Sequence, residues 1–267
     1  MAFFPTGRVP VRRRLASLCV ELWLPLLLVV AAWFASARST SIYFPPLAVI
    51  LATFERLWLF DQVASDVLPS LQNLAIGLGI ATFAGITLGL LLGLLPRLHD
   101  ALSPLLELLR AVPGVALLPL LLLLLGIGPL MRISVIAYAT TWPILLNTID
   151  GVRSVDPVVL DVARSYRLSR WQKMWRVILP AASPQIITGM RISLSLGVTV
   201  IFFSELVGSA NGIGHRMLEY QRSFAIPEMW SGIILMGLLG YLLNIGFRGF
   251  EHIALRWHRG MQRREDV

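Results

Sequence analysis

Lysine and cysteine are almost absent from this sequence, and each shortage excludes a class of site. The only lysine, Lys173, follows Gln172, so the chain has no Gly-Lys-Ser/Thr loop with which to bind the phosphates of ATP. The only cysteine, Cys19, permits neither an intrachain disulfide nor a metal site built from several cysteines. Any ATP hydrolysis that drives this protein must therefore take place in another chain.

The common catalytic motifs are missing as well. The sequence has no His-Glu-x-x-His motif and no Gly-x-Ser-x-Gly motif, which excludes the usual zinc protease centre and the usual serine hydrolase turn. Its few histidines are scattered along the chain, at His99, His215, His252 and His258. We predict that the chain is not an enzyme and holds no metal or cofactor of its own.

Charged residues are scarce, at 14%, whereas 56% of the residues are hydrophobic and the mean hydropathy is +0.74. Soluble domains have a lower apolar fraction, so this composition predicts a protein of the lipid bilayer. The net charge of +8 would suit a nucleic-acid-binding protein, but basic residues also collect on the cytoplasmic side of membrane proteins. Their positions along the chain decide between these alternatives.

Six apolar runs are long enough to cross about 30 Å of hydrocarbon as helices. The first run follows four N-terminal arginines and ends near Ala35-Ser36-Ala37, a pattern that a cleaved secretory signal shares. Its length and the spans that follow favour a retained helix. We predict an all-α, polytopic membrane protein with six transmembrane helices, at about residues 20–37, 71–95, 103–125, 133–149, 186–207 and 229–250.

The basic residues indicate how these spans are oriented. Six spans place both termini on one side, and eighteen of the 23 Lys and Arg residues then fall on that side. By the positive-inside rule this side is the cytoplasm, so the positive charge requires no nucleic acid. The predicted organisation is a cytoplasmic segment 1–19, a first span 20–37, an outer interfacial segment 38–70, a helical core 71–250 with a cytoplasmic loop 150–184, and a cytoplasmic tail 251–267.

Two spans contain features beyond hydrophobicity. The second carries small residues at four-residue steps, which predicts a ridge for close helix packing, although glycine is also common in membrane helices generally. The third contains Pro113 and Pro119, which should kink or break it, and broken helices either line a transport pathway or serve packing alone. The ridge consists of Gly77, Ala81, Gly85, Gly89 and Gly93.

The most polar stretch of the chain, 156–180, lies between the fourth and fifth spans. Asp156 and Pro157 predict a helix start, Ser169 can cap a second helix, and Pro180 is expected to end it. A DNA-binding helix-turn-helix has a similar pattern, but the flanking spans would keep this one from a major groove. A loop that only fixes topology needs charge alone, whereas this stretch also has caps and tryptophans, so we interpret it as a docking surface for a partner protein.

Several segments of the sequence together match the pattern of one known family. They are Asp161-Val162-Ala163, Val177-Ile178-Leu179-Pro180, 108–120, Gly126-Ile127-Gly128, 143–148 with 151–156, Glu205 and Asn211-Gly212-Ile213-Gly214. With these segments, which cover about residues 70–250, the sequence resembles the type I binding-protein-dependent ABC importer permeases of the nitrate, sulfonate and taurine branch. It departs from the family motif at Asp161, where the family has Glu, and at Arg167, where it has Gly, so that either the turn differs or Arg167 adds a charged contact.

The resemblance implies a permease that works as a pair in a bacterial cytoplasmic (inner) membrane.

ATP and magnesium would be bound by two cytoplasmic ATPase subunits, and an extracytoplasmic binding protein would deliver a small solute such as a sulfonate, taurine or nitrate. The permease pair would be a homodimer in the bilayer, with no nucleic-acid partner. A non-transport scaffold that recruits cytoplasmic partners through the same loop is the alternative. The residues expected to couple to the ATPase are Asp161, Ala163, Arg164, Tyr166, Arg167 and Leu168.

A second group of residues is expected at the outer end of the spans. Glu205 is a carboxylate inside an apolar span, which is costly unless it is paired or hydrated. It forms either a structural hydrogen bond or part of an outer gate. The predicted pathway or gate residues are Pro113, Pro119, Glu205, Asn211, Gly212 and Gly214.

Overall fold

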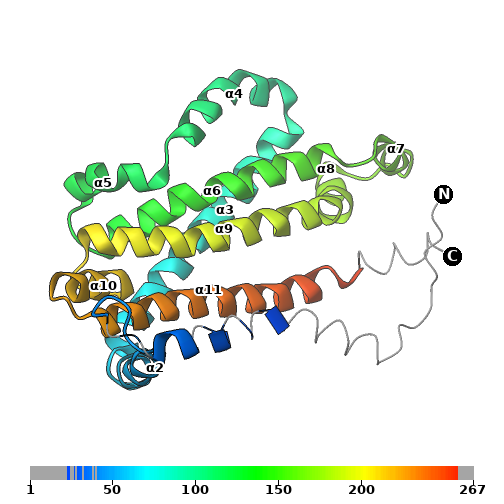
Figure 1. The fold of residues 1–267 in the computed structure, drawn as a ribbon. Coiled ribbons are helices and arrows are strands. Elements are labelled where there is room, and N and C mark those ends of the chain that lie inside the picture. Colours follow the sequence, from blue (N-terminus) through cyan, green and yellow to red (C-terminus); the bar gives the residue numbers. More distant parts are fainter. Residues whose placement is uncertain are drawn as a thin grey trace, which may run out of the picture.

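The computed structural model describes residues 23, 24, 27, 29–31, 33–37, 39 and 41–257 (Figure 1). The predicted segment 1–19 and the end of the tail, 258–267, lie outside these residues, as does part of the predicted first span, 20–37. Every regular element of the described part is helical. The elements are α2 (Leu47–Arg56), η1 (Leu57–Asp61), η2 (Val63–Val67), α3 (Leu68–Leu94), α4 (Pro96–Ala111), η3 (Gly114–Leu117), α5 (Leu118–Leu125), α6 (Pro129–Arg153), α7 (Pro157–Ser165), α8 (Arg170–Lys173), η4 (Met174–Ile178), α9 (Leu179–Gly208), α10 (Ile213–Arg222) and α11 (Ile226–Ala254).

Four helices of the described residues are long and apolar enough to cross a membrane. A fifth crossing is formed if the bent pair Pro96–Ala111 and Gly114–Leu125 counts as one span, with a bend of 77° between its halves. The predicted span that remains is the N-terminal one, 20–37, and part of it lies outside the described residues. The four uninterrupted helices are Val63–Leu94, Pro129–Arg153, Arg170–Val207 and Ile226–Ala254.

The centre of the bundle is α6, which packs between α3 and α9. All five residues of the small-residue ridge on α3 are buried. A Cβ atom added to Gly89 would lie 2.5 Å from Cβ of Thr148, and one added to Gly85 would lie 2.8 Å from Cγ2 of Ile144. The backbones of α3 and α6 therefore approach so closely that only small residues fit along this line.

The third predicted span is broken at Pro113. Val112 and Pro113 are both extended, which separates α4 from the 3₁₀ turn η3, and the residue before a proline avoids the helical region for steric reasons. Pro119 lies in the first turn of α5, where its missing N–H costs no hydrogen bond. A Cβ on Gly114 would lie 2.7 Å from Cβ of Ala139, so the break brings the chain directly against α6.

The predicted start of this span at Ser103 and Pro104 is wrong. The helix α4 begins at Pro96, and Pro104 lies inside it. Pro96 suits a first helical position, and the hydrogen bond that Pro104 cannot donate would go to Asp100, which is exposed to solvent. Glu107 and Arg110 are three residues apart, a spacing that allows pairing on one helix face, but they form no ion pair with each other among the described residues.

The expected helix end at Pro180 is wrong as well. The chain continues as one helix from Arg170 to Val207, with Pro180 in the first turn of α9. Just before it, η4 is a π turn in which the N–H of Leu179 donates to the carbonyl of Met174. The wider turn changes the hydrogen-bond register and so accommodates a residue that has no N–H to donate.

Candidate functional site

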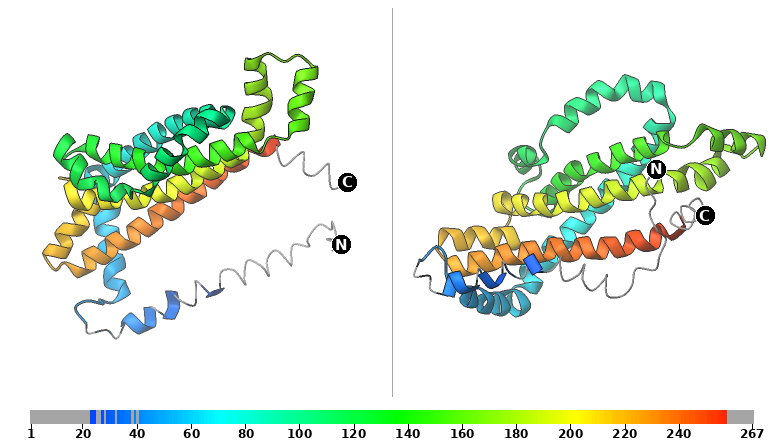
Figure 2. Two further views of the ribbon diagram at one scale, coloured as in Figure 1. Left: turned by 90° about the horizontal axis from the view of Figure 1, so that it is seen from above. Right: turned by 45° about the vertical axis from the view of Figure 1, so that its right-hand side comes forward.

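The most polar stretch of the sequence folds as a hairpin of two short helices, α7 and α8, which projects from one end of the bundle (Figure 2). Asp156 caps α7, since its side chain accepts a hydrogen bond of 2.8 Å from the N–H of Val158. Ser169 and Gln172 form a reciprocal capping box at α8, with bonds of 3.2 Å and 3.0 Å. Both helix starts therefore form where the local sequence predicts them.

The turn of the hairpin passes through Arg167, which has a left-handed backbone with a φ of 53°. Its N–H donates to the carbonyl of Arg164 at 2.8 Å, and the N–H of Leu168 donates to the carbonyl of Ala163 at 3.1 Å. These two bonds are a Schellman motif, in which glycine usually occupies the left-handed position. Arg167 thus keeps the turn that glycine favours, at a cost of about 1 kcal/mol, and exposes its side chain.

The surface of the hairpin combines exposed apolar and charged side chains. Tyr166 is 78% exposed and Trp171 is 70% exposed, and the rings of Trp171 and Trp175 lie edge to face with centroids 5.2 Å apart. Asp161 and Arg164 form an exposed ion pair of 2.7 Å. An apolar and charged surface of this kind is typical of a contact with another protein.

Two predicted coupling residues lie away from this surface, and two residues that were not predicted are exposed on it. Ala163 is only 4% exposed, so its side chain serves packing within the hairpin, and Leu168 is half-buried beside it in the turn. Val158 and Val162 are exposed on α7, one helical turn apart. Their i, i+4 spacing was the signal in the sequence that could have identified them.

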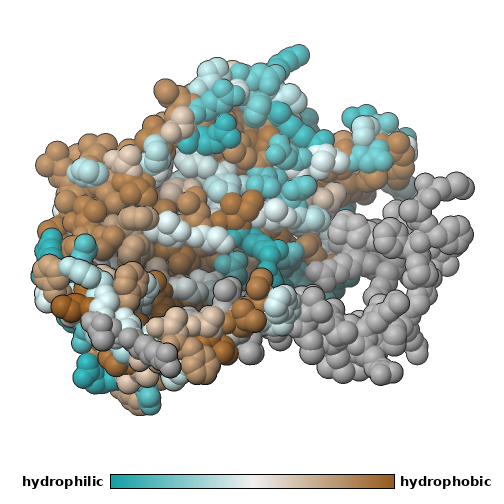
Figure 3. Space-filling model, viewed as in Figure 1, coloured by the Kyte–Doolittle hydropathy of each residue, from teal (hydrophilic) through white to brown (hydrophobic). Residues whose placement is uncertain are grey.

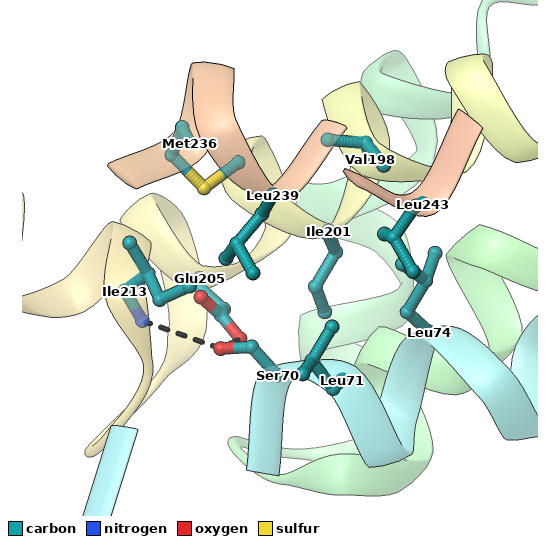
Figure 4. Close-up of a pocket in the computed structure, with 10 residues that line it drawn as sticks. All are labelled: Ser70, Leu71, Leu74, Val198, Ile201, Glu205, Ile213, Met236, Leu239 and Leu243. Atoms are coloured by element: carbon teal, nitrogen blue, oxygen red, sulfur yellow. Dashed lines mark hydrogen bonds between the residues drawn. The ribbon is translucent and has the colours of Figure 1, made fainter. Parts of the chain in front are cut away.

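At the opposite end of the bundle, Glu205 is 1% exposed and is held by three elements. The hydroxyl of Ser70 donates to its Oε1 at 2.6 Å, and the N–H of Gly214 donates to its Oε2 at 3.0 Å. Nη1 of Arg132, which is itself 3% exposed, lies 3.7 Å from Oε1. Figure 4 shows the Glu205 and Ser70 side chains pointing toward one another among apolar residues.

Asp66 forms a second buried carboxylate in the same region, with no exposed surface. Its Oδ1 accepts from the N–H of Gly212 at 2.8 Å, and its Oδ2 accepts from Nε of Arg216 at 3.1 Å. This hydrogen bond raises the pKa of the Arg216 guanidinium and keeps it charged. The outer cluster, defined as Asp66, Ser70, Arg132, Glu205, Gly212, Gly214 and Arg216, therefore pairs two carboxylates with two guanidinium groups.

The Asn-Gly-Ile-Gly segment of the sequence supplies the backbone of this cluster. Arg132 donates to the carbonyl and to Oδ1 of Asn211, each at 3.3 Å. Gly212 has a φ of 113°, and a Cβ there would lie 2.5 Å from Cδ of Glu205. A Cβ on Gly214 would lie 2.5 Å from the carbonyl oxygen of Phe202. Both glycines are thus required by close approach, and one of them also by its backbone angle.

The sequence predicted Glu205, Asn211, Gly212 and Gly214 for this end, but it missed their partners. Asp66 and Ser70 lie in the segment that was expected to be interfacial, and η2 and the start of α3 instead place them inside the bundle. Arg132 is near the start of α6 and Arg216 is on α10. The contacts Arg132–Glu205 and Asp66–Arg216 join residues 73 and 150 positions apart, so no local pattern links them.

The remaining predicted pathway residues are on the broken helix. Pro113 lines a groove of about 370 Å³ between the break, α6 and α9, together with Arg110, Trp142, Pro143 and Leu196. Pro119 is exposed in the first turn of α5 and is not among the lining residues. The break therefore brings Pro113 to a cavity, whereas Pro119 lies outside it.

Comparisons with known proteins agree with this architecture. Residues 85–256 match the family model described as "Binding-protein-dependent transport system inner membrane component". The chain is 34% identical to the taurine transport system permease protein TauC of Escherichia coli (strain K12) over 72% of its length and 70% of that protein. It is 37% identical to the nitrate import permease protein NrtB of Leptolyngbya laminosa, over 71% of its own length and 67% of the relative.

A solved structure shows the same fold. A chain of the MetNI methionine ABC transporter, in an inward-facing conformation, superimposes with a TM-score of 0.63 over 74% of this chain and 97% of that one, at 19% identity. The chain belongs to the family of binding-protein-dependent inner-membrane transport components, as a type I ABC importer permease of the nitrate, sulfonate and taurine branch.

Proposed function

We propose that the chain forms one half of the transmembrane pathway of an ATP-driven importer for a small oxyanion such as a sulfonate, taurine or nitrate. The observation that carries this proposal is the single helix from Arg170 to Val207, which joins the exposed hairpin to the outer cluster. Its 38 residues extend over about 57 Å. A movement imposed on the hairpin can therefore reach Glu205 through one rigid element.

The partners follow from the family and from the two ends of the molecule. A second copy of this chain completes the pathway, and two cytoplasmic ATPase subunits bind ATP and magnesium and seat the hairpin through Asp161, Arg164, Tyr166 and Arg167. An extracytoplasmic binding protein delivers the solute at the other end. In this arrangement both termini and the hairpin face the cytoplasm.

The outer cluster is proposed as the gate of this pathway. Its hydrogen bonds and ion pairs connect four helical regions, namely α10, the end of α9, the start of α6, and the start of α3 with the adjoining η2. Closure of the ATPase pair would move the hairpin and α9, and would separate these ties to open the pathway outward. Hydrolysis would restore them. Normal transport by a Glu205→Gln variant would contradict a role for this charge in gating.

The test is reconstitution of the permease, its ATPase and its binding protein in proteoliposomes. We expect ATP hydrolysis to rise when the loaded binding protein is added, and Tyr166→Ala to abolish this rise while the permease remains folded. Tyr241→Ala is the matched control, because Tyr241 is also an exposed tyrosine but lies on α11 and not on the hairpin. If neither hydrolysis nor uptake responds to the binding protein, the scaffold alternative replaces the importer.

A further inference from the structure

The groove at Pro113 lies at the level of the middle of the bundle. Its α6 residues include Ala139, Trp142 and Pro143, and Trp142 is about 20 Å along the helix from its start at Pro129 and about 16 Å from its end at Arg153. Discontinuous helices form substrate sites near the membrane midplane in many transporters. The break between α4 and η3 is such a discontinuity.

Arg110 brings a positive charge to this level. It lines the groove, and the carbonyl of its neighbour Leu109 accepts a hydrogen bond of 2.6 Å from the hydroxyl of Tyr138 on α6. Arg110 lies near the end of α4, whose Leu98, Leu102 and Leu106 pack beside Leu145 and Ile149 of α6, just before the chain breaks. Figure 3 shows hydrophilic residues gathered over α4 and hydrophobic ones covering α5.

The charge of Arg110 is not compensated within the described part of the chain. Arg110 takes part in none of its ion pairs, and Glu107, one turn earlier, does not contact it. Arg110 is also the one charged side chain among the described residues that line the groove. Arg110 is exposed, and a cation without a counterion in a membrane-spanning segment is costly unless it faces water or a ligand, so its place on the groove indicates a functional site.

A second donor without a partner belongs to the same groove. Nε1 of Trp142 is buried and has no hydrogen-bond partner among the described residues. Buried indole N–H groups normally have an acceptor, so this one is an exception that needs an explanation. The groove thus offers a guanidinium group and lies beside an unsatisfied N–H, while its other lining residues are almost all apolar.

We propose that this groove is a transient binding site for a small oxyanion on the translocation pathway, and that Arg110 is the residue that selects for negative charge. A guanidinium group binds the planar or tetrahedral oxygens of nitrate, sulfonate or bicarbonate through paired hydrogen bonds. The proposal rests on the importer function, and it adds the group in this chain that distinguishes anions from neutral and cationic solutes. A lipid phosphate would have to leave the headgroup region to reach this depth, so a transported anion is the better occupant.

The experiment measures uptake by the reconstituted complex of permease, ATPase and binding protein. Nitrate and bicarbonate are the anionic probes, taurine is a zwitterion that carries a sulfonate group, and glycine betaine and choline are the zwitterionic and cationic probes without an oxyanion of nitrogen or sulfur. We expect uptake of the imported anion to fall about tenfold or more in Arg110→Gln and to be retained in part by Arg110→Lys. Stimulation of ATP hydrolysis by the binding protein should persist in both variants, which a misfolded permease would not show.

Arg97→Gln is the matched control, because Arg97 is an exposed arginine at the start of the same helix and does not line the groove. Its uptake should equal that of the unmodified complex.

Trp142→Phe, which keeps an aromatic ring and removes the N–H, should lower anion uptake about twofold to tenfold. Unchanged anion uptake by Arg110→Gln, or a complex that imports only the probes without an oxyanion, would contradict the proposed oxyanion-binding site and leave the importer function intact. Failure of the binding protein to stimulate hydrolysis would overturn both.

Discussion

The hairpin and the outer cluster lie at opposite ends of one helix, and they are built on opposite principles. The hairpin exposes Tyr166 and Trp171, and its capping and turn bonds join residues that are close in the sequence. The outer cluster buries Asp66 and Glu205, and its bonds join residues that are far apart. A surface that binds and releases a partner must be stable by itself, whereas a gate has to be a set of tertiary contacts that movement can separate.

Among the substitutions that test this difference between the hairpin and the outer cluster, Glu205→Ala should have the largest effect on stability. Removing the carboxylate leaves Arg132 buried without its counterion, so we expect a loss of about 3–5 kcal/mol in the free energy of unfolding. Denaturation in detergent micelles, followed by circular dichroism, measures it. Glu228→Ala is the control, since Glu228 is only half-buried and its partner Arg56 is exposed, so that this pair should contribute at most about 1 kcal/mol. Equal stability of the two variants would show that the outer cluster contributes no more than a surface pair.

At the hairpin, Tyr166→Ala should affect binding and leave stability unchanged. The ring is 78% exposed in the free chain, so its loss creates no cavity, but an aromatic contact in a protein interface often contributes about 2 kcal/mol. We expect about thirtyfold weaker association with the ATPase subunit in detergent solution. A drop in thermal stability without a change in affinity would instead assign Tyr166 to the fold.

Gly212→Ala should strain the outer cluster without removing a charge. The added Cβ would meet the carboxylate of Glu205 in a backbone conformation that L-residues rarely adopt, and the expected cost is about 1–3 kcal/mol. Gly79→Ala is the matched control, since a Cβ on Gly79 meets nothing within 4 Å. Denaturation of the two variants under the same conditions gives the difference, and a cost as small in Gly212→Ala as in Gly79→Ala would contradict the close approach.

The substitution with the smallest expected effect should raise stability instead of lowering it. Arg167→Gly removes a side chain from a left-handed position, so it should stabilise the hairpin by about 1 kcal/mol. Its effect on ATPase affinity separates the two roles of the residue, because weaker binding despite higher stability would identify Arg167 as a contact. If the variant is less stable, the turn does not have the conformation described.

The comparison also explains which features were predictable. The starts of α7 and α8 follow from Asp156 and Ser169, because a cap and the helix it begins are adjacent in the chain. The break at Pro113 follows in the same way from local sterics. Pro180 was predicted to end a helix and does not, because the π turn of η4 changes the hydrogen-bond register, and no residue near it signals that turn.

The sequence by itself determined the helical class, the hydrophobic spans, the hairpin and the family, since these depend on composition, periodicity and neighbouring residues. Only the tertiary structure decided that Asp66 meets Arg216, that Glu205 meets Ser70, and that Arg110 lies beside the middle of α6. These contacts depend on how α3, α4, α6 and α9 pack. The free energy of burying a charge is set by the groups that surround it in space, and a linear pattern does not contain them.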